Sequence, residues 1–477
     1  MEKESVVVSE RYSVPLVKFV SLYASAYGLM FLFLDAMFWD DWFVNFTLNR
    51  EQTLQYWKDM LGFFPTNRFI EVFVLNRNPV AFHIVIFVSF FISGLLLFQI
   101  LKRIPGITEK SNVMICTLFL ILPINSARVS MATIRLSYSL TIFLFAWLLL
   151  VQSKYKRVVY LSLPLFYFSF LTQGLVPFFV LPCLHLFYII YFVKHRSARA
   201  AALKALAVLL SGGIYFIMMR LLDPPPAARI DYYTPTLSGL ARALLFLLLG
   251  VVVLWRSFRF YDFRGPEKFG GVQMIGLGVF SLSLGSFAYL ASGRLMNFSE
   301  WILNFVPNAS DWDSRHQLLL GIGFAMIISG LIDLFPENFG RLFFKVAVLF
   351  CLVFNFIYMR DYLLDWKKQT AIVENLRDLP MPSEVNVVMV YETEASQKFN
   401  ARGRLIRSYE WEALFEKGTS KKNVEVIYSG RIDCLGDRSQ IPDTLMTIDA
   451  LNSNMKAIIL RDPGIIVGLE KINPCNE

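Results

Sequence analysis

The sequence predicts a polytopic α-helical membrane protein with about eleven transmembrane helices, followed by a small C-terminal α/β domain. Of the 477 residues, 56% are hydrophobic and only 17% are charged. The mean hydropathy is +0.51. A soluble domain cannot bury that much apolar surface, whereas helices in a lipid bilayer do not need to bury it. The composition therefore favours a membrane protein and argues against an ordinary soluble enzyme.

Each predicted transmembrane segment is an apolar run of the length that a bilayer requires. A helix needs about 20 apolar residues to cross the hydrocarbon core. The runs of this kind are 14–38, 79–101, 111–127, 136–152, 158–173, 175–193, 201–222, 239–255, 271–292, 317–335 and 342–358. The first run is long enough to span by itself, and no secretory signal peptide precedes it.

The lysines of the membrane part predict its orientation. In this topology the lysines between residues 59 and 358 all fall in or beside loops on one side: Lys102, Lys110, Lys154, Lys156, Lys194, Lys204, Lys268 and Lys345. Cytoplasmic loops carry an excess of Lys and Arg, so we expect this side to be cytoplasmic. An odd number of spans then places the N-terminus inside and the C-terminus on the exoplasmic side. We expect an integral membrane protein of a bacterial inner or cell membrane.

The composition changes after Tyr358, which predicts two domains. Residues 1–358 form the transmembrane domain and carry the basic excess, whereas residues 359–477 are nearly neutral. The basic excess indicates cytoplasmic loops that face anionic lipid rather than a nucleic-acid partner. The tail begins with a predicted helix from Asp361 to Leu379, and short β-rich runs follow at 385–391, 424–428 and 457–460. A helix followed by spaced short strands is typical of a small α/β domain, here on the exoplasmic side.

Two adjacent carboxylates, Asp40 and Asp41, lie between Trp39 and Trp42 where the first apolar run ends. Tryptophan is enriched at the bilayer–water interface, so the pair is expected at headgroup depth. Ionisable groups at this depth are costly and are functional hypotheses by default. The long exoplasmic loop at 39–78 that contains them is predicted to include a stretch lying flat on the membrane. The alternative is that the two carboxylates only cap a helix N-terminus in this loop.

Arginine persists on the exoplasmic side, where the orientation rule predicts depletion. Arginine binds phosphate through a planar, bidentate fork and stays charged when partly buried. The candidates for binding a phosphate are Arg128, Arg135, Arg315, Arg294 and Arg68. The alternative for any one of them is snorkelling, or pairing with Asp223, Asp311 or Asp313.

Several kinds of chemistry have no support in the sequence. Of the four histidines only His316 is expected on the exoplasmic side, and no zinc spacing is present. There is no Walker loop, nucleophile elbow or Gly-rich dinucleotide turn. The carboxylates and arginines that remain suit group transfer from a lipid-linked phosphate. In such a reaction arginine neutralises the leaving phosphate, and a carboxylate takes the proton of the acceptor.

These features resemble the GT-C superfamily of polytopic glycosyltransferases, which use polyprenyl-phosphate sugars on the exoplasmic face. The resemblance covers the layout of the whole chain. It depends on the acidic pair in a long loop after the first helix, the proline-containing stretch at 122–138, the short joint at 170–174, and the soluble C-terminal domain. One departure is that Gln173-Gly174 replaces the charged Lys-Glu of many members.

The resemblance implies an enzyme in which Asp41 or Asp40 is the catalytic base, or helps to hold a divalent cation such as Mg or Mn. It also implies that exoplasmic arginines bind the donor phosphate. The partners would be a polyprenyl-phosphate sugar donor, a glycan or lipid acceptor, and membrane lipids.

Three other functions stay open. A flippase or transporter of lipid-linked sugars would also need basic exoplasmic patches, but it would need neither the acidic pair nor the exoplasmic tail. A polysaccharide polymerase or ligase shares most of these residues but usually lacks such a tail. The third alternative is a scaffold without catalytic activity.

Overall fold

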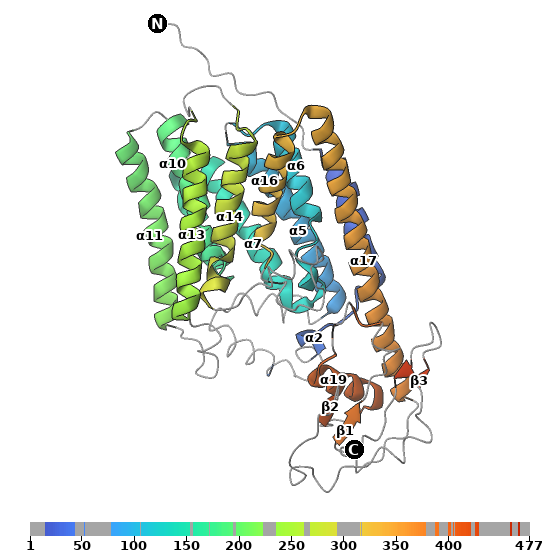
Figure 1. Cartoon of the computed structure of the whole chain (residues 1–477). Helices are drawn as coiled ribbons and strands as arrows, with labels where there is room; N and C mark the ends of the chain where they lie inside the picture. Colours follow the sequence, from blue (N-terminus) through green and yellow to red (C-terminus); the bar gives the residue numbers. More distant parts are fainter. Residues whose placement is uncertain are drawn as a thin grey trace.

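The computed structural model describes residues 15–42, 52, 78–104, 106–152, 156–170, 172–193, 197–222, 235–261, 268–292, 315, 317–377, 387–390, 399–401, 404, 406–420, 425–428, 458–459 and 466–467. Within these residues the chain is mainly helical. The long helices lie side by side as a bundle (Figure 1). The helices before α17 are α1 (Leu16–Tyr27), η1 (Gly28–Leu32), α2 (Asp40–Trp42), α5 (Pro79–Leu101), α6 (Glu109–Ile121), η4 (Ser126–Val129), η5 (Met131–Thr133), α7 (Ile134–Gln152), α8 (Lys156–Ser169), α9 (Leu175–Phe178), α10 (Val180–Tyr188), η6 (Ile189–Val193), α11 (Ala198–Leu222), α13 (Leu237–Phe258), α14 (Gly271–Ala291) and α16 (Leu320–Asp333).

Seven helical segments of the described residues are long and apolar enough to cross a membrane, so the chain has the character of a multi-pass membrane protein. They are α5, α7, the run Leu175–Phe192, α11, α13, α14 and α17. Each of the eleven predicted runs contains a helix, but the helices in runs 14–38, 111–127, 158–173 and 317–335 are shorter. The predicted count of eleven spans is therefore not confirmed.

The starts of α5 and α6 follow local capping signals in the sequence. The Asn78 side chain accepts a hydrogen bond from the Val80 amide, and Pro79 occupies the first turn of α5. Thr108 caps α6 by accepting from the Ser111 amide at 3.0 Å. In both cases the cap fixes the point at which an apolar run becomes a helix.

Helices α14 and α16 approach each other closely through glycine. A Cβ atom added at Gly278 would lie 2.7 Å from the carbonyl oxygen of Gly323. No side chain fits at that distance, so glycine is required at this contact. By contrast, α11 and α13 leave most of their side chains exposed on the outside of the bundle, where lipid would cover them.

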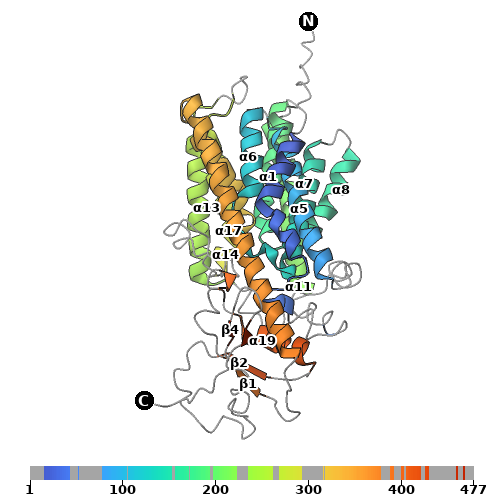
Figure 2. The same cartoon turned by 90° about the vertical axis from the view of Figure 1, so that its right-hand side faces the viewer.

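Helix α17 (Glu337–Arg377) has 41 residues and projects beyond the bundle (Figures 1 and 2). At 1.5 Å per residue it is about 60 Å long, roughly twice the thickness of the hydrocarbon core. The predicted helix at 361–379 is thus the continuation of the last apolar run and not a separate element. The physical reason is that neither Gly nor Pro occurs between Arg341 and Leu379, so nothing interrupts the helix where the apolar composition ends.

The C-terminal part contains helix α19 (Ser408–Thr419) between two strands of one parallel pair. Strand β1 (Val387–Val390) pairs with β2 (Glu425–Tyr428), and their parallel direction requires a crossover such as α19. Strands β3 (Ile458–Ile459) and β4 (Ile466–Val467) form an antiparallel pair. Most residues after 420 lie outside the described part, so the predicted α/β domain is not confirmed as a whole.

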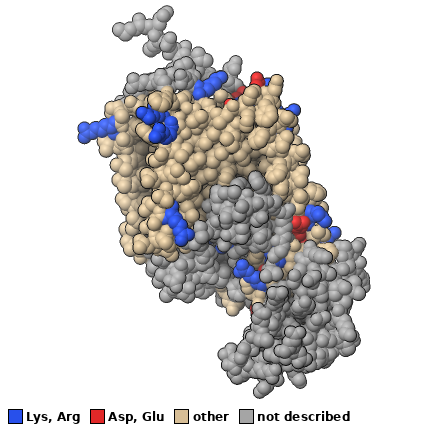
Figure 3. Space-filling model, viewed as in Figure 1, with Lys and Arg blue, Asp and Glu red and all other residues tan. Residues whose placement is uncertain are grey.

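We use the name docking end for the end of the bundle where α2 and α19 meet the C-terminal part of α17 (Figure 1). In the face drawn in Figure 3, charged residues gather toward the two ends of the bundle and leave a band without charge between them. This distribution agrees with a hydrocarbon layer around the middle of the bundle.

Candidate functional site

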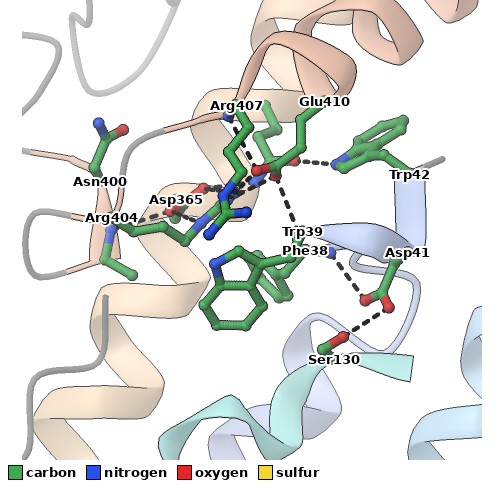
Figure 4. A network of polar contacts seen from close by, with 12 residues as sticks. Phe38, Trp39, Asp41, Trp42, Ser130, Asp365, Asn400, Arg404, Arg407 and Glu410 are labelled. Carbon is green, nitrogen blue, oxygen red and sulfur yellow. Dashed lines mark hydrogen bonds and ion pairs between the residues drawn. The ribbon is translucent and has the colours of Figure 1, made fainter. Parts of the chain in front are cut away.

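The predicted acidic pair lies in a tight turn at the docking end, residues 39–42, which we call the acidic turn. Trp39 and Trp42 are buried, at 2% and 0% exposure. Trp39 has a φ of 52°, a left-handed conformation that is uncommon for a residue with a side chain. The turn lies between two parts of the chain (Figure 4). One is the joint between α6 and α7, residues 122–133. The other is formed by α17 and α19.

Asp41 attaches the acidic turn to the joint. Its Oδ1 accepts a hydrogen bond from the Ser130 hydroxyl at 2.7 Å. Its Oδ2 accepts from the backbone amides of Met131 and Phe38, each at 3.0 Å. The side chain is only 2% exposed, so these donors belong to the protein and fix the orientation of the carboxylate. The side chain of Asp40 lies outside the described part.

The described partners of Asp41 are hydrogen-bond donors and not further oxygen ligands for a cation. Mg²⁺ and Mn²⁺ take several oxygen ligands in a near-octahedral arrangement. The Asp41 carboxylate accepts instead from three N–H or O–H donors, one on Oδ1 and two on Oδ2. No group of three His, Cys, Asp or Glu side chains suited to a metal occurs among the described residues.

On its other side the acidic turn is bonded to α17 and α19. The Trp39 amide donates to Glu410 Oε2 at 3.0 Å, and the Trp42 indole donates to Gln369 Oε1 at 2.6 Å (Figure 4). Gln369 in turn donates to Asp365 Oδ1 at 2.5 Å. The turn is therefore held between the membrane bundle and the C-terminal part of the chain.

A buried cluster of ionised groups supports these contacts. Arg404 Nη1 lies 2.6 Å from Glu410 Oε2, and its Nε lies 3.1 Å from Asp365 Oδ2. All three side chains are at most 1% exposed. Burial alone would lower the pKa of Arg404, but the Asp365 and Glu410 carboxylates raise it, so the guanidinium stays charged.

Lys368 lies next to this cluster on the part of α17 that projects beyond the bundle, and donates to Asn400 Oδ1. Burial lowers the pKa of Lys368 to about 7, although the nearby Asp365 carboxylate opposes this change. This cluster was not predicted from the sequence. One local signal was present in the sequence: Asp365 and Gln369 are spaced i, i+4, so they share a helix face with Tyr362. All three side chains of this face are buried.

Arg128 is the predicted phosphate ligand with the most unusual surroundings. It lies in η4, at 6% exposure, with its guanidinium carbon 3.6 Å from the centre of the Tyr27 ring and 4.5 Å from that of Phe90. Rings at these distances stabilise a cation through their π faces. Burial lowers the pKa of Arg128 to about 10, which still leaves it charged at pH 7. Its Nη1 has no hydrogen-bond partner, and no carboxylate pairs with it, among the residues that the structure describes.

Other buried polar atoms near the joint are also without a partner in the described chain. They are Tyr27 Oη, Asn125 Oδ1 and Arg135 Nε. Tyr27 packs on Arg128, and Asn125 directly precedes η4. A buried polar atom that makes no hydrogen bond costs roughly 1–3 kcal/mol, so several near one joint mark a place where a ligand or water completes the bonding.

His83 of α5 links the joint to the chain that leads into the acidic turn. Its Nδ1 lies 2.6 Å from the Leu34 carbonyl oxygen, and its Nε2 lies 2.6 Å from that of Val129. Both neighbours are acceptors, so a neutral ring donates to only one of them. His83 thus fixes the joint and the segment that follows η1 to the same place on α5.

Of the remaining arginines predicted to bind phosphate, the structure describes Arg315. Arg315 is partly buried shortly before α16. Several predictions fall outside the described residues, namely those on Arg68, Arg294, His316, Asp223, Asp311, Asp313 and most of the loop at 39–78. Gly174 packs closely against Tyr289 and Leu319, so the structure leaves little room here for the charged side chain that many GT-C members have.

The joint and the acidic turn together place a buried cation close to a bonded carboxylate. Arg128 offers a charged fork between aromatic rings, and the Asp41 carboxylate is bonded to Ser130 of the same joint, two residues from Arg128 in the sequence. Comparison of the chain with protein-family models, with curated proteins and with solved structures finds no match in any of the three.

Proposed function

We propose that this protein is a membrane glycosyltransferase of the GT-C type, which moves a sugar from a polyprenyl-phosphate donor to a glycan or lipid acceptor at the docking end. The observation that carries the proposal is the buried guanidinium of Arg128. An ionised side chain taken out of water without a counter-ion is several kcal/mol unfavourable. A bound phosphate would supply the missing negative charge and accept from the free Nη1.

The surroundings of Arg128 favour a phosphate attached to lipid. The joint lies at the end of an apolar helical bundle, so a ligand there is close to the hydrocarbon layer. Tyr27 and Phe90 exclude water from the guanidinium and strengthen its attraction to an anion. Arg135, at the start of α7, is the second proposed ligand because its Nε is also buried without a partner in the described chain. Arg315, Arg294 and Arg68 follow.

The reaction needs a base as well as a phosphate ligand. The bond from the sugar to the phosphate oxygen breaks, a bond to the acceptor hydroxyl forms, and the hydroxyl proton passes to a carboxylate. Arginine stabilises the negative charge that stays on the leaving phosphate. Three protein donors already bind Asp41. Of the acidic pair, Asp40 is therefore the better base, and Asp41 holds the turn against the joint.

We further propose that all eleven helical segments cross the membrane, with the N-terminus inside and the docking end on the exoplasmic side of a bacterial membrane. The one-sided lysines support this orientation. The same arrangement would make residues 359–477 an exoplasmic α/β domain, which the parallel pair β1–β2 with α19 supports.

Binding of a lipid phosphate tests the proposal. Purified protein is offered polyprenyl phosphate and, separately, the polyprenol of the same length, and the affinities are measured in detergent. We expect wild type to prefer the phosphate. Arg128→Lys should bind about 10-fold more weakly because it lacks the fork, and Arg128→Ala about 10–100-fold more weakly, since a charge-assisted hydrogen bond contributes roughly 1.5–3 kcal/mol.

The matched control is Arg341→Ala. Arg341 is an exposed arginine of α17 that pairs with Glu337. This variant should bind like wild type. A folded Arg128→Ala protein with unchanged preference for polyprenyl phosphate would contradict the proposal.

A further inference from the structure

We infer that Glu410 of α19 is a positioning residue of the transfer site, which holds the acidic turn in its working conformation from the C-terminal part of the chain. The effect of Glu410 on catalysis rests on the proposed function. The contacts of Glu410 with the acidic turn do not depend on that function. It assigns a role to the C-terminal part that no single predicted motif suggested.

The Glu410 carboxylate joins the start of α19 to the acidic turn. Its Oε1 accepts from the Arg407 amide at 3.1 Å, which caps the start of α19. Its Oε2 accepts from the Trp39 amide at 3.0 Å. Both oxygens also accept from Arg404 Nη1, at 2.9 and 2.6 Å. A side chain with this many fixed bonds has a single orientation, and it passes that orientation on to the backbone of the acidic turn.

Trp39 needs this support because of its backbone conformation. Its φ of 52° lies in the left-handed region, which a tryptophan does not favour by itself. Besides the bond to Glu410, the Arg404 guanidinium carbon lies 5.3 Å from the centre of the Trp39 ring and 5.5 Å from that of Phe38. Glu410 and its partner Arg404 therefore hold both the amide and the ring of Trp39 in place.

The acidic turn is fixed at Trp39 and at Asp41, and the bond of Asp41 lies close to the proposed phosphate ligand Arg128. Asp41 bonds to Ser130, which is only two residues from Arg128. A continuous set of hydrogen bonds thus runs from α19 through residues 39–41 to the joint. If Glu410 releases Trp39, the acidic pair can move relative to Arg128, while Arg128 keeps its own contacts with Tyr27 and Phe90.

A purely stabilising role accounts less well for an ionised cluster at this place. Replacing a buried ion pair by apolar side chains of similar size is often neutral or stabilising, so such a pair is weak evidence for stability. Charged partners with fixed geometry orient the groups to which they are bonded. Here they orient the turn that carries the proposed base, Asp40, and also Asp41, which holds the turn against the joint.

The test compares Glu410→Gln with Glu416→Gln in the full-length protein. Glu416 is a partly buried carboxylate of the same helix whose side chain makes no described bond to the turn. In Glu410→Gln an NH₂ group replaces one carboxylate oxygen. This group is itself a donor, so it cannot accept from the Trp39 and Arg407 amides or from Arg404. Amide hydrogen exchange of residues 38–42 is measured by mass spectrometry, together with kcat and KM for a polyprenyl-phosphate sugar.

We expect Glu410→Gln to raise exchange in the acidic turn at least 10-fold and to lower kcat at least 10-fold, with KM for the donor within about twofold of wild type. Glu416→Gln should match wild type in all three measurements. If Glu410→Gln loses the exchange protection of α19 itself, Glu410→Asp replaces it. Aspartate keeps the charge beside Arg404 but is too short to hold Arg404 and Trp39 together.

Unchanged exchange in the turn of both Glu410 variants would overturn the inference, because Trp39 would then be held without them. Faster exchange with unchanged kcat would overturn it as well. If wild type transfers no sugar from any polyprenyl phosphate, the proposed function fails. The exchange measurement needs no substrate, so it would still decide whether Glu410 holds the turn.

Discussion

Arg404 and Lys368 show how strongly the partners of a buried cation decide its charge. Arg404 has two carboxylates, and they raise its pKa although burial opposes them. Lys368 bonds to an uncharged amide oxygen, and burial lowers its pKa to about 7. The two side chains belong to one cluster, so they differ in partners rather than in exposure.

Lys368 gives a prediction about pH. Its pKa of about 7 in the folded protein lies below the ordinary value of 10.5. Below pH 7 both the folded and the unfolded protein bind the proton, so the unfavourable burial of the charge is present in full. Between pH 7 and 10.5 only the unfolded state keeps the proton. The free energy of unfolding should therefore rise with pH in this window, by at most about 1.4 kcal/mol per unit.

Lys368→Met removes this contribution. The stability of wild type relative to Lys368→Met should increase from pH 6 to pH 9, as measured by denaturant unfolding in detergent. Lys345→Met, at an exposed position of the same helix, should keep a constant difference from wild type. A difference for Lys368→Met that does not change with pH would show that the buried amine does not titrate in this range.

The sequence singled out Asp41 and Arg128, and the structure brings both to one joint. Their partners were not predictable. Ser130 is 89 positions from Asp41, and Glu410 is 371 positions from Trp39. Contacts over such distances depend on how helices pack and leave no local pattern. The acidic pair was visible because its charge is unusual beside tryptophan, whereas Glu410 lies in a tail in which charges are ordinary.

At the scale of elements, the sequence predicted where helices lie better than where they end. Apolar runs and caps are local signals, so α5 occupies the predicted run at 79–101 without any shift. The predicted boundary at residue 358 follows the change in composition, but α17 continues to Arg377. Composition marks the edge of the apolar layer, whereas a helix ends only where its backbone is interrupted or capped.

The packing of α14 on α16 gives a prediction about stability. In Gly278→Ala the added Cβ would lie 2.7 Å from the Gly323 carbonyl oxygen and 2.9 Å from the Ile327 nitrogen. Both are backbone atoms, so the helices must separate, and we expect a loss of about 1–3 kcal/mol in unfolding free energy.

Gly213→Ala is the matched control, because a Cβ at Gly213 of α11 would meet no atom within 4 Å. It should be neutral or stabilising by up to about 1 kcal/mol through helix propensity. Thermal or denaturant unfolding of both variants in one detergent measures the difference. A Gly278→Ala protein as stable as Gly213→Ala would mean that α14 and α16 do not approach so closely.

At the scale of the whole molecule, the C-terminal part and the membrane bundle meet at the acidic turn. The bundle contributes Asp41 and Arg128, and the C-terminal part contributes Glu410 and Arg404. The sequence predicted the two parts and their order. It did not predict that the turn would be bonded to both, because this follows from the unbroken length of α17, which brings α19 to the docking end.

The proposed transfer reaction is tested most directly by following both halves of a polyprenyl-phosphate sugar that carries one label on the sugar and another on the lipid. The protein is placed in vesicles with a native membrane extract that supplies acceptors. Wild type should move the sugar label to a product without the lipid label and release an equal amount of polyprenyl phosphate.

Asp40→Asn should lower this rate about 10²–10⁴-fold, because the proposed base is lost. Asp41→Asn should lower it by loosening the turn, and Arg341→Ala should leave it unchanged. The account would be contradicted if both labels stayed on one molecule that only changed leaflet, or if the variant carrying both Asp40→Asn and Asp41→Asn stayed fully active.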